Sequence, residues 1–175
     1  DTTKITMIYE GGPAKPEYSL QQNKLVNQYL NTNQPYFVFV SGWRPHKGIL
    51  TLLKAFTEFK KSSQKPHKLV LIGDQSAAGP DVYAAIEDHP FKSDLIMPGF
   101  APENLLPSLY HNAVACIIPS EYEGFGLPVL EAFSYKVPVI VANNSSLPEV
   151  AGDGALYFPT KNASQLAKRM REIVK

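Results

Sequence analysis

The chain has only one cysteine among its 175 residues, which excludes an internal disulfide and every metal site built from several cysteines. Cys116 lies in the apolar run 114–118, so we expect a buried strand residue rather than a reactive thiol. No apolar stretch approaches the roughly 20 residues that a membrane-spanning helix needs. The first residues do not form a secretory signal peptide either. The expected location is the cytoplasm, with the inner face of a membrane as the alternative.

The sequence also has little net charge. Its 17 lysines and arginines nearly balance 16 aspartates and glutamates, which leaves a formal net charge of +1. No global field therefore attracts a polyanion, so we expect no nucleic-acid partner and look for anion binding in local chemistry. With 44% hydrophobic and 19% charged residues the composition is that of a soluble globular protein. The length suits one domain of about 100–200 residues.

Apolar runs of strand length alternate with helical patterns along the chain. We expect strands at residues 5–9, 36–40, 69–72, 95–97, 113–118, 137–141 and 155–158. Helical spacing marks residues 49–59, 81–89, 103–111, 127–135 and 163–174, with a shorter helix near 20–30. Several strands are continuously apolar, as in parallel sheets buried on both faces. The pattern predicts an α/β fold with an open, doubly wound, Rossmann-like parallel sheet and helices on both faces.

The segment 121–131 is the richest in chemistry-bearing residues. Two glycines, Gly124 and Gly126, allow the backbone to pass close to a ligand with its N–H groups exposed. A helix whose Pro128 suits the first turn begins just behind them, and a helix N-terminus favours phosphate oxygens. Glu123 in the loop and Glu131 in the helix are carboxylates suited to sugar or ribose hydroxyls. This strand-to-helix junction therefore predicts a site for a diphosphate-bearing ligand.

A second loop, residues 41–48, follows the expected strand 36–40. Arg44 and Lys47 lie there, and both are cations suited to a diphosphate. Trp43 is expected to brace this loop against the sheet, and His46 to be a surface or packing residue. Because ligands of open α/β sheets bind at the carboxyl ends of the strands, we expect both loops at one edge.

These two loops resemble the donor-binding domain of family 4 glycosyltransferases, the retaining group with the GT-B fold. The E-x7-E motif is the most specific element, and Glu123-Gly-Phe-Gly-Leu-Pro-Val-Leu-Glu131 matches it fully. The resemblance covers nearly the whole chain, with weaker matches at residues 70–73, 98–100, 118–120 and 137–140. It implies one half of a GT-B fold, a single nucleotide-sugar-binding domain over residues 1–175 without its N-terminal acceptor-binding domain.

The resemblance also implies site residues. Glu123, Lys47 and Arg44 would be catalytic, with Glu123 on the transferred sugar and the two cations neutralising the departing diphosphate. Many family members place the Arg six positions before the Lys, whereas here they are three apart, which makes Lys47 the firmer assignment. The donor would be bound by Gly42, Gly73, Gly99, Phe100, Gly124, Phe125, Gly126, Leu127 and Glu131. Within this set Glu131 would hold the ribose, and Gly99 and Phe100 would flank the base.

The expected chemistry needs no metal and no cofactor. A glycosyl donor carries its own leaving group, so the protein has to stabilise charge on the diphosphate. The chain has no D-x-D motif, the usual metal-holding motif of the other large glycosyltransferase fold. We therefore expect a UDP- or GDP-sugar as substrate, with retention implied by the resemblance alone. The missing N-terminal domain is the expected partner, so the isolated domain would be inactive, and membrane association would come only through that domain or a lipid acceptor.

Other functions stay open at this point. A nucleotide-sugar epimerase would share the fold and the diphosphate loop, and a non-catalytic nucleotide-sugar-binding module would share the site. A dinucleotide-binding Rossmann module is disfavoured because no G-x-G-x-x-G follows the first expected strand. Residues 145–149 are expected to cap a short helix beside the donor pocket, with Glu149 as a further contact.

Overall fold

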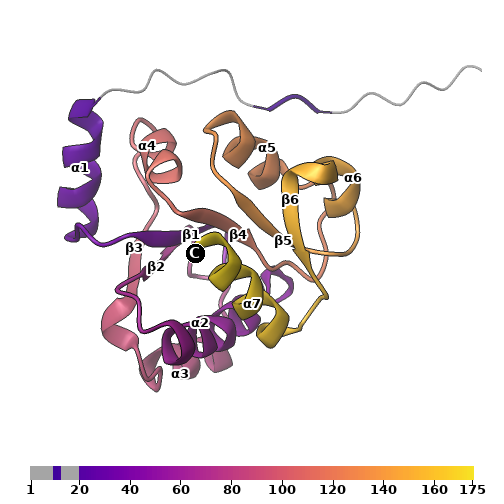
Figure 1. Cartoon of the computed structure of the whole chain (residues 1–175), viewed down its shortest axis with the longest axis horizontal. Coiled ribbons are helices and arrows are strands. Elements are labelled where there is room, and N and C mark those ends of the chain that lie inside the picture. Colours follow the sequence, from indigo (N-terminus) through magenta and orange to yellow (C-terminus); the bar gives the residue numbers. More distant parts are fainter. Residues whose placement is uncertain (1–9, 13–19) are drawn as a thin grey trace, which may run out of the picture.

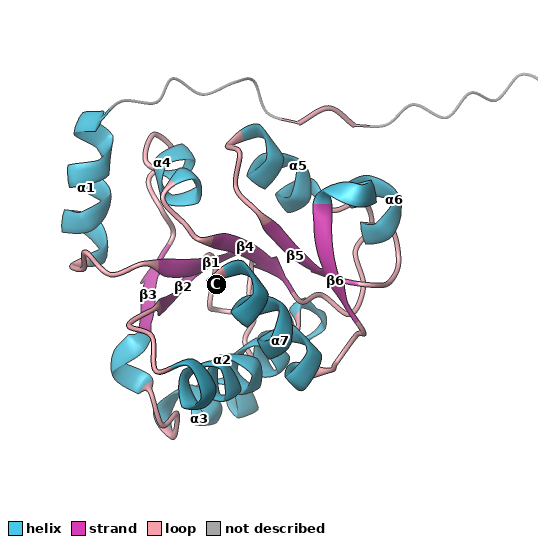
Figure 2. Ribbon diagram, in the orientation of Figure 1, coloured by secondary structure: helices cyan, strands magenta, loops and turns pink. Residues whose placement is uncertain are grey.

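A computed structural model describes residues 10–12 and 20–175, so the strand expected at residues 5–9 lies outside it. Six parallel strands form one sheet with helices on both faces (Figures 1 and 2). This arrangement confirms the predicted doubly wound α/β fold. The strands are β1 (Tyr36–Val40), β2 (Lys68–Ile72), β3 (Leu95–Gly99), β4 (Ala115–Ile118), β5 (Val139–Ala142) and β6 (Ala155–Phe158).

The helices connect these strands in sequence. The α-helices are α1 (Leu20–Leu30), α2 (Ile49–Ser63), α3 (Pro80–Glu87), α4 (Leu106–His111), α5 (Leu127–Ser134), α6 (Leu147–Ala151) and α7 (Ala163–Ile173). Short 3-10 turns η2 (Pro45–Lys47), η3 (Lys92–Asp94) and η4 (Gly152–Gly154) complete the connections. In Figure 1, α2, α3 and α7 cover the lower face of the sheet, while α4 and α5 cover the upper face.

The strand order β3-β2-β1-β4-β5-β6 places β1 and β4 at the centre of the sheet. From β1 the chain winds outward to β3, then returns to β4 and winds outward in the opposite direction. The connections after β1 and β4 therefore leave toward opposite faces, and a crevice forms where they separate. The fold thus places its ligand site between residues 41–48 and residues 119–126.

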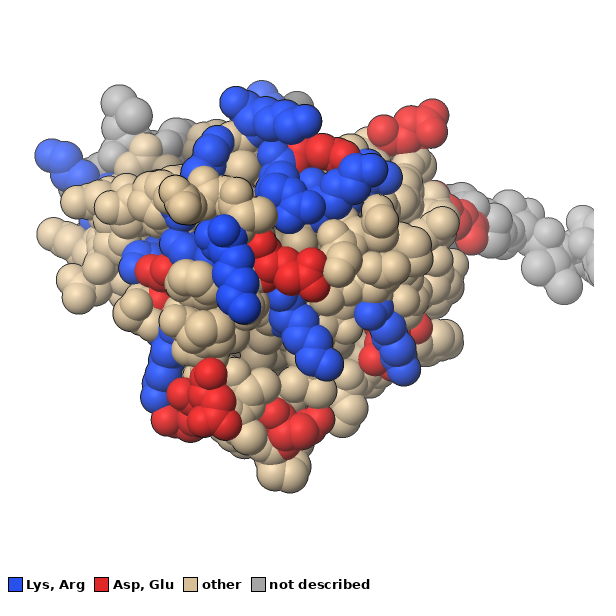
Figure 3. Space-filling model, turned by 60° about the horizontal axis from the view of Figure 1, so that its bottom comes forward, with Lys and Arg blue, Asp and Glu red and all other residues tan. Residues whose placement is uncertain are grey.

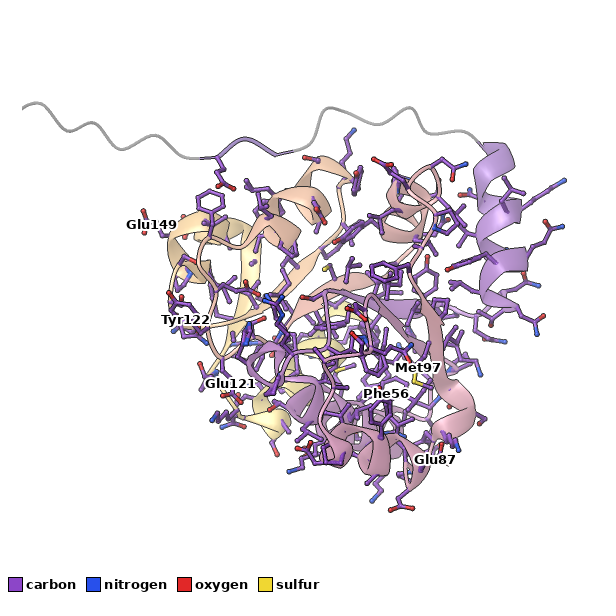
Figure 4. The ribbon with its side chains drawn as sticks, turned by 180° about the vertical axis from the view of Figure 1, so that it is seen from behind. Phe56, Glu87, Met97, Glu121, Tyr122 and Glu149 are labelled. Atoms are coloured by element: carbon purple, nitrogen blue, oxygen red, sulfur yellow. The ribbon has the colours of Figure 1, made fainter. Side chains whose placement is uncertain are left out.

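The core explains why the apolar runs are continuous. Every residue of β4 and β5 is buried, and four of the five residues of β1 are buried as well. Helix α2 turns one apolar stripe toward this sheet, including the fully buried Phe56, which Figure 4 shows in the interior. Cys116 is fully buried in β4, as expected, and burial raises the pKa of its thiol.

Several element boundaries differ from the predicted ones. The helix expected at 103–111 begins at Leu106, because a helix starting earlier would place Pro107 in its interior, where its missing N–H removes a hydrogen bond. Strand β5 begins at Val139 rather than Val137, since the N–H of Val137 instead bonds to Ala132 at the end of α5. Strand β4 begins at Ala115, because Ala113 closes the turn after α4.

We expect the stability of the folded chain to fall in acid because the His67 side chain is buried. Its ring is buried between Phe37 and Phe59, with centroid distances of 5.5 Å to each. Burial, with repulsion from Lys65 and Lys60, lowers the pKa of His67 from 6.5 to about 4. Between these pH values the unfolded chain binds a proton that the folded chain does not. The neutral, buried His67 side chain therefore stabilises the fold fully above about pH 6.5. As the pH falls toward 4, the free energy of unfolding should decrease by about 2 kcal/mol.

Urea unfolding at a series of pH values between 7 and 4 would measure this decline. The His67→Phe variant should lose this part of the pH dependence, whereas His46→Phe, at a partly exposed histidine, should keep it. Equal pH dependence of the two variants would contradict the assignment to His67.

Candidate functional site

The loops after β1 and β4 meet at the predicted crevice. The N–H of Glu121 donates a hydrogen bond to the carbonyl oxygen of His46 at 2.7 Å. Gly48 has a φ of 72°, and a Cβ there would overlap the carbonyl oxygen of Pro119. Only glycine permits both the left-handed conformation and this close approach. Trp43 is buried, as expected for the residue that braces this loop, and its backbone N–H donates to the carbonyl oxygen of Asp74 at 2.7 Å.

Lys47 and Glu123 form an ion pair across the crevice. The Lys47 ammonium donates to both carboxylate oxygens of Glu123, at 2.7 and 2.9 Å. The two side chains are only 15% and 10% exposed, so water screens the pair weakly. The buried Ser120 hydroxyl donates to Glu123 Oε1 at 2.7 Å and fixes the carboxylate further. The structure thus joins two of the three residues predicted to be catalytic.

A third loop, residues 143–146, holds the Glu123 segment from behind. Ser145 donates to the carbonyl oxygen of Glu123, and Ser146 donates to the carbonyl oxygens of Glu123 and Phe125 at 3.1 and 2.8 Å. Residues 145–149 were predicted to cap a short helix. Helix α6 does begin there, but the expected side-chain capping hydrogen bond is not formed. Ser146 precedes α6, but its side chain makes no capping hydrogen bond because it is engaged with the site loop.

The Lys47–Glu123 pair lies on the wall of an open pocket of about 680 Å³. Gly126 precedes α5 with a φ of 106°, a left-handed conformation that turns the chain from the loop into the helix. No side chain caps this helix start, so its first amide groups remain available for an anion. The lining comprises Glu10, Lys47, Glu123, Gly124, Phe125, Gly126, Leu127 and Pro128, which brings six predicted site residues together.

A second hollow, of about 240 Å³, lies at the ends of β1, β2 and β3. It contains three further predicted residues, Gly42, Gly73 and Phe100, and Phe100 is 75% exposed at its rim. Gly99 is adjacent, because its carbonyl oxygen accepts a hydrogen bond from the N–H of Gly73 at 2.8 Å. Most of the other lining residues are apolar, and a planar, partly apolar group would suit this hollow.

Glu131 is held by a residue that the sequence did not single out. The Tyr110 hydroxyl donates to Glu131 Oε2 at 2.7 Å, from a ring that is fully buried. Burial, with the neighbouring Cys116 and Glu131, raises the pKa of Tyr110 well above its usual value, so the hydroxyl remains a donor. The pairing joins α4 to α5 and fixes one carboxylate oxygen. Ser120 was missed likewise, and Ser145 and Ser146 were expected beside the pocket but only as helix-capping residues, because nothing in their local sequence shows what they contact.

Two predicted contacts lie away from the Lys47 pocket. Arg44 is exposed and lines a separate hollow of about 400 Å³ with His46, Asp81 and Glu121. Glu149 is exposed on α6 and points outward (Figure 4). The structure therefore keeps Lys47 in the pocket and leaves the roles of Arg44 and Glu149 without geometric support.

Neither a metal site nor a membrane span emerges from the part of the chain that the structure describes. Within residues 10–12 and 20–175, no group of three or more His, Cys, Asp or Glu side chains could hold a metal ion. In the same ranges, no helix has both the length and the apolar character to cross a membrane.

Several known proteins with similar sequences are named as sugar transferases. Residues 21–175 match the family described as "Glycosyl transferases group 1". The chain is 33% identical over 155 residues to O-antigen chain mannosyltransferase B of Escherichia coli, covering 89% of this chain and 40% of that protein. It is 29% identical over 157 residues to the O-antigen chain mannosyltransferase RfbU of Salmonella typhimurium, covering 90% and 40%. The chain thus spans about two-fifths of the length of these relatives.

Solved structures share the architecture. A glycosyltransferase from Rickettsia africae matches with a TM-score of 0.87 at 21% identity, over 99% of this chain and 48% of that one. Anabaena HepE, solved with UDP and glucose, matches with a TM-score of 0.77 at 19% identity, over 90% and 44%. At these identities the likeness concerns the fold, and it confirms the predicted Rossmann-like half of a GT-B architecture.

Proposed function

Because the chain belongs to the glycosyl transferases group 1 family, we propose that it is the donor-binding domain of a two-domain enzyme. The enzyme would transfer a sugar from a nucleoside-diphosphate sugar to an acceptor hydroxyl, with retention and without a metal. The observation that carries this proposal is the Lys47–Glu123 pair beside the uncapped start of α5, at the switch point of the sheet.

The two hollows suggest how the donor lies along the carboxyl edge. The base would enter the hollow at Gly42, Gly73 and Phe100, where mostly apolar residues surround it. The diphosphate would lie at Lys47 and the first amides of α5, where a cation and a helix N-terminus act together. Glu131, with one oxygen held by Tyr110, would offer its other oxygen to the ribose.

The ion pair itself suggests how binding changes the site. A diphosphate near Lys47 would compete with Glu123 for the ammonium. As Lys47 turned toward phosphate, the Glu123 carboxylate would be released to accept hydrogen bonds from the sugar hydroxyls. Ser120 would keep the carboxylate in place during this exchange. Lys47 would then stabilise the charge that develops on the leaving diphosphate, which is where such a group accelerates the reaction most.

The relatives suggest the sugar. Both are named as mannosyltransferases, so we propose a mannosyl donor, GDP- or UDP-linked, and a glycan acceptor. The acceptor would bind an N-terminal domain, placing the reaction across a cleft between two domains in the cytoplasm. The isolated chain is then expected to bind a donor nucleotide without completing transfer.

Thermal unfolding with GDP, UDP, ADP and CMP tests this proposal directly. A ligand present at 100 times its dissociation constant stabilises a protein by about 2.7 kcal/mol, a readily measured rise in melting temperature. We expect one diphosphate to stabilise the wild-type chain but not the Glu131→Gln variant. Glu149→Gln is the matched control, since the same substitution on the outward-facing residue should leave the rise unchanged. Equal responses of both variants, or no response to any nucleotide, would contradict the proposed donor site.

A further inference from the structure

Positive charge is concentrated in two helical segments. Residues 49–65 and 163–175 contain eight of the 17 lysines and arginines but only two of the 16 acidic residues, Glu58 and Glu172. The chain as a whole carries a formal charge of only +1, so the remaining residues are net acidic. The small total charge therefore conceals a strong separation of charge within the domain.

These two segments lie side by side on one face of the sheet (Figure 1). Ser164 donates to Glu58 Oε1 at 3.0 Å, and Arg171 donates to Ser62 Oγ at 3.1 Å. Lys65 donates to the carbonyl oxygen of Val174. The partners advance together along both segments, so α2 and α7 run parallel and their cations form one surface.

Most of these eight cations have no carboxylate partner among the described residues, and Lys54, Lys61, Lys168 and Lys175 are exposed. Lys60 is paired with Asp94 at 2.9 Å, and Arg169 with Glu172 at 2.7 Å. Among the described residues, the other six have no carboxylate within salt-bridge distance. We call these six the basic α2–α7 face: Lys54, Lys61, Lys65, Lys168, Arg171 and Lys175. Figure 3, which brings the lower side of Figure 1 forward, shows lysine and arginine side chains spread over this side with acidic side chains among them.

We propose that the basic α2–α7 face docks on a membrane surface rich in anionic lipid headgroups. On α2 and α7 these six cations are joined by a single carboxylate, Glu58, that has no ion-pair partner among the described residues, so these two helices complement a negatively charged plane. None of the six lines any of the three hollows described above, which argues against a small anion as the occupant.

The composition of the face disfavours nucleic acid as the occupant. Single-stranded nucleic acid binds on exposed aromatic rings between the cations. The large exposed hydrophobic side chains of the described residues lie outside α2 and α7: Leu25, Tyr83, Phe100, Tyr122 and Leu127. Long lysine side chains on two adjacent helices instead suit a broad array of headgroup phosphates, which they approach without inserting. This differs from the sequence-based expectation that membrane contact comes only through the absent domain or a lipid acceptor.

The position of the face is compatible with the proposed donor site. Helix α2 leaves the carboxyl end of β1 and runs back along the sheet, so Lys61 and Lys65 lie toward the amino edge. The Lys47 pocket lies at the opposite, carboxyl edge. Docking would therefore hold the domain at the membrane while the donor pocket remains open.

Vesicle binding tests the proposal on the 175-residue chain. We expect sedimentation with vesicles of phosphatidylglycerol and phosphatidylcholine, but not with pure phosphatidylcholine, and release as salt is raised to about 0.5 M. Each basic residue at an anionic surface strengthens binding roughly fivefold, so the Lys54→Gln/Lys61→Gln/Lys168→Gln variant should bind about a hundredfold more weakly. The control Lys24→Gln/Lys92→Gln/Lys136→Gln removes the same charge elsewhere and should bind nearly as the wild type does.

Two outcomes would overturn the proposal: no preference for anionic vesicles, or equal weakening in the two triple variants. Binding of heparin through the same three lysines without vesicle binding would also overturn it, in favour of a soluble polyanion. Melting temperatures of both variants establish that they fold. The result is independent of the donor site, because nucleotide-induced stabilisation should be the same in both triple variants and the wild type.

Discussion

The Lys47→Met variant should be about 3 kcal/mol less stable than the wild-type chain, because it leaves a nearly buried carboxylate without its cation. Glu123 is only 10% exposed, and after the substitution the Ser120 hydroxyl would be the one group of the described residues left hydrogen-bonded to its carboxylate. Methionine keeps the length of the lysine stem, so the loss reports the charge rather than a cavity. Urea unfolding near neutral pH would measure it.

A second substitution separates charge from packing. In the Lys47→Met/Glu123→Gln variant neither charge remains, so most of the lost stability should return. If the double variant is no more stable than Lys47→Met, the ion pair is not what the lysine contributes. Under the proposed function, both variants should also lose stabilisation by the donor nucleotide, including the double variant whose stability has recovered. Stability and binding would thus be assigned to the same pair by two different measurements.

Gly48→Ala should lower the free energy of unfolding by about 3 kcal/mol, since it combines a left-handed backbone with a backbone overlap. A Cβ at this position would overlap Pro119, so the loops after β1 and β4 would have to separate. The hydrogen bond between Glu121 and His46 would lengthen with them. Chemical denaturation would measure the loss, and a weaker response to the donor nucleotide would show the disturbance of the site.

Gly42→Ala is the matched control for this variant. Gly42 lies in the same loop, its φ is not left-handed, and no atom lies within 4 Å of an added Cβ. We expect its stability to stay within about 0.5 kcal/mol of the wild type. Comparable destabilisation by the two alanines would show that the loop tolerates neither, and that close contact with Pro119 is not the cause.

The fold was largely predictable because its signals are local. Strands β1 and β6 have the predicted bounds, since each is an apolar run between polar or turn-forming residues. The error at α4 arose because Pro107 sets where the helix starts, and the error at β5 because the N–H of Val137 closes α5 instead of pairing with the sheet. Those choices depend on neighbours that an apolar pattern does not show.

The sequence indicated candidate residues for the site but not the contacts between them. The sequence placed Lys47 and Glu123 in separate loops, and only the sheet order brings the two loops together. Tyr110, which holds Glu131, lies in a helix that is otherwise read as an amphipathic connection. Arg44 is the opposite example: it lies in the loop where a cation was expected, but it lines a hollow other than the Lys47 pocket.

The central position of β1 and β4 also bears on how the molecule assembles. Phe37 in β1 pairs with Ala115 in β4, although the two residues are far apart in the sequence. Strands β2 and β3, which lie between them in the sequence, are placed on the other side of β1. Closing such a long loop costs chain entropy before the contact can offset it, and topologies rich in these contacts fold slowly. Residues 36–99 can pair their three strands first, and residues 115–158 likewise. The crevice between Lys47 and Glu123 exists only after these two halves join, so ligand binding can report completion of the fold.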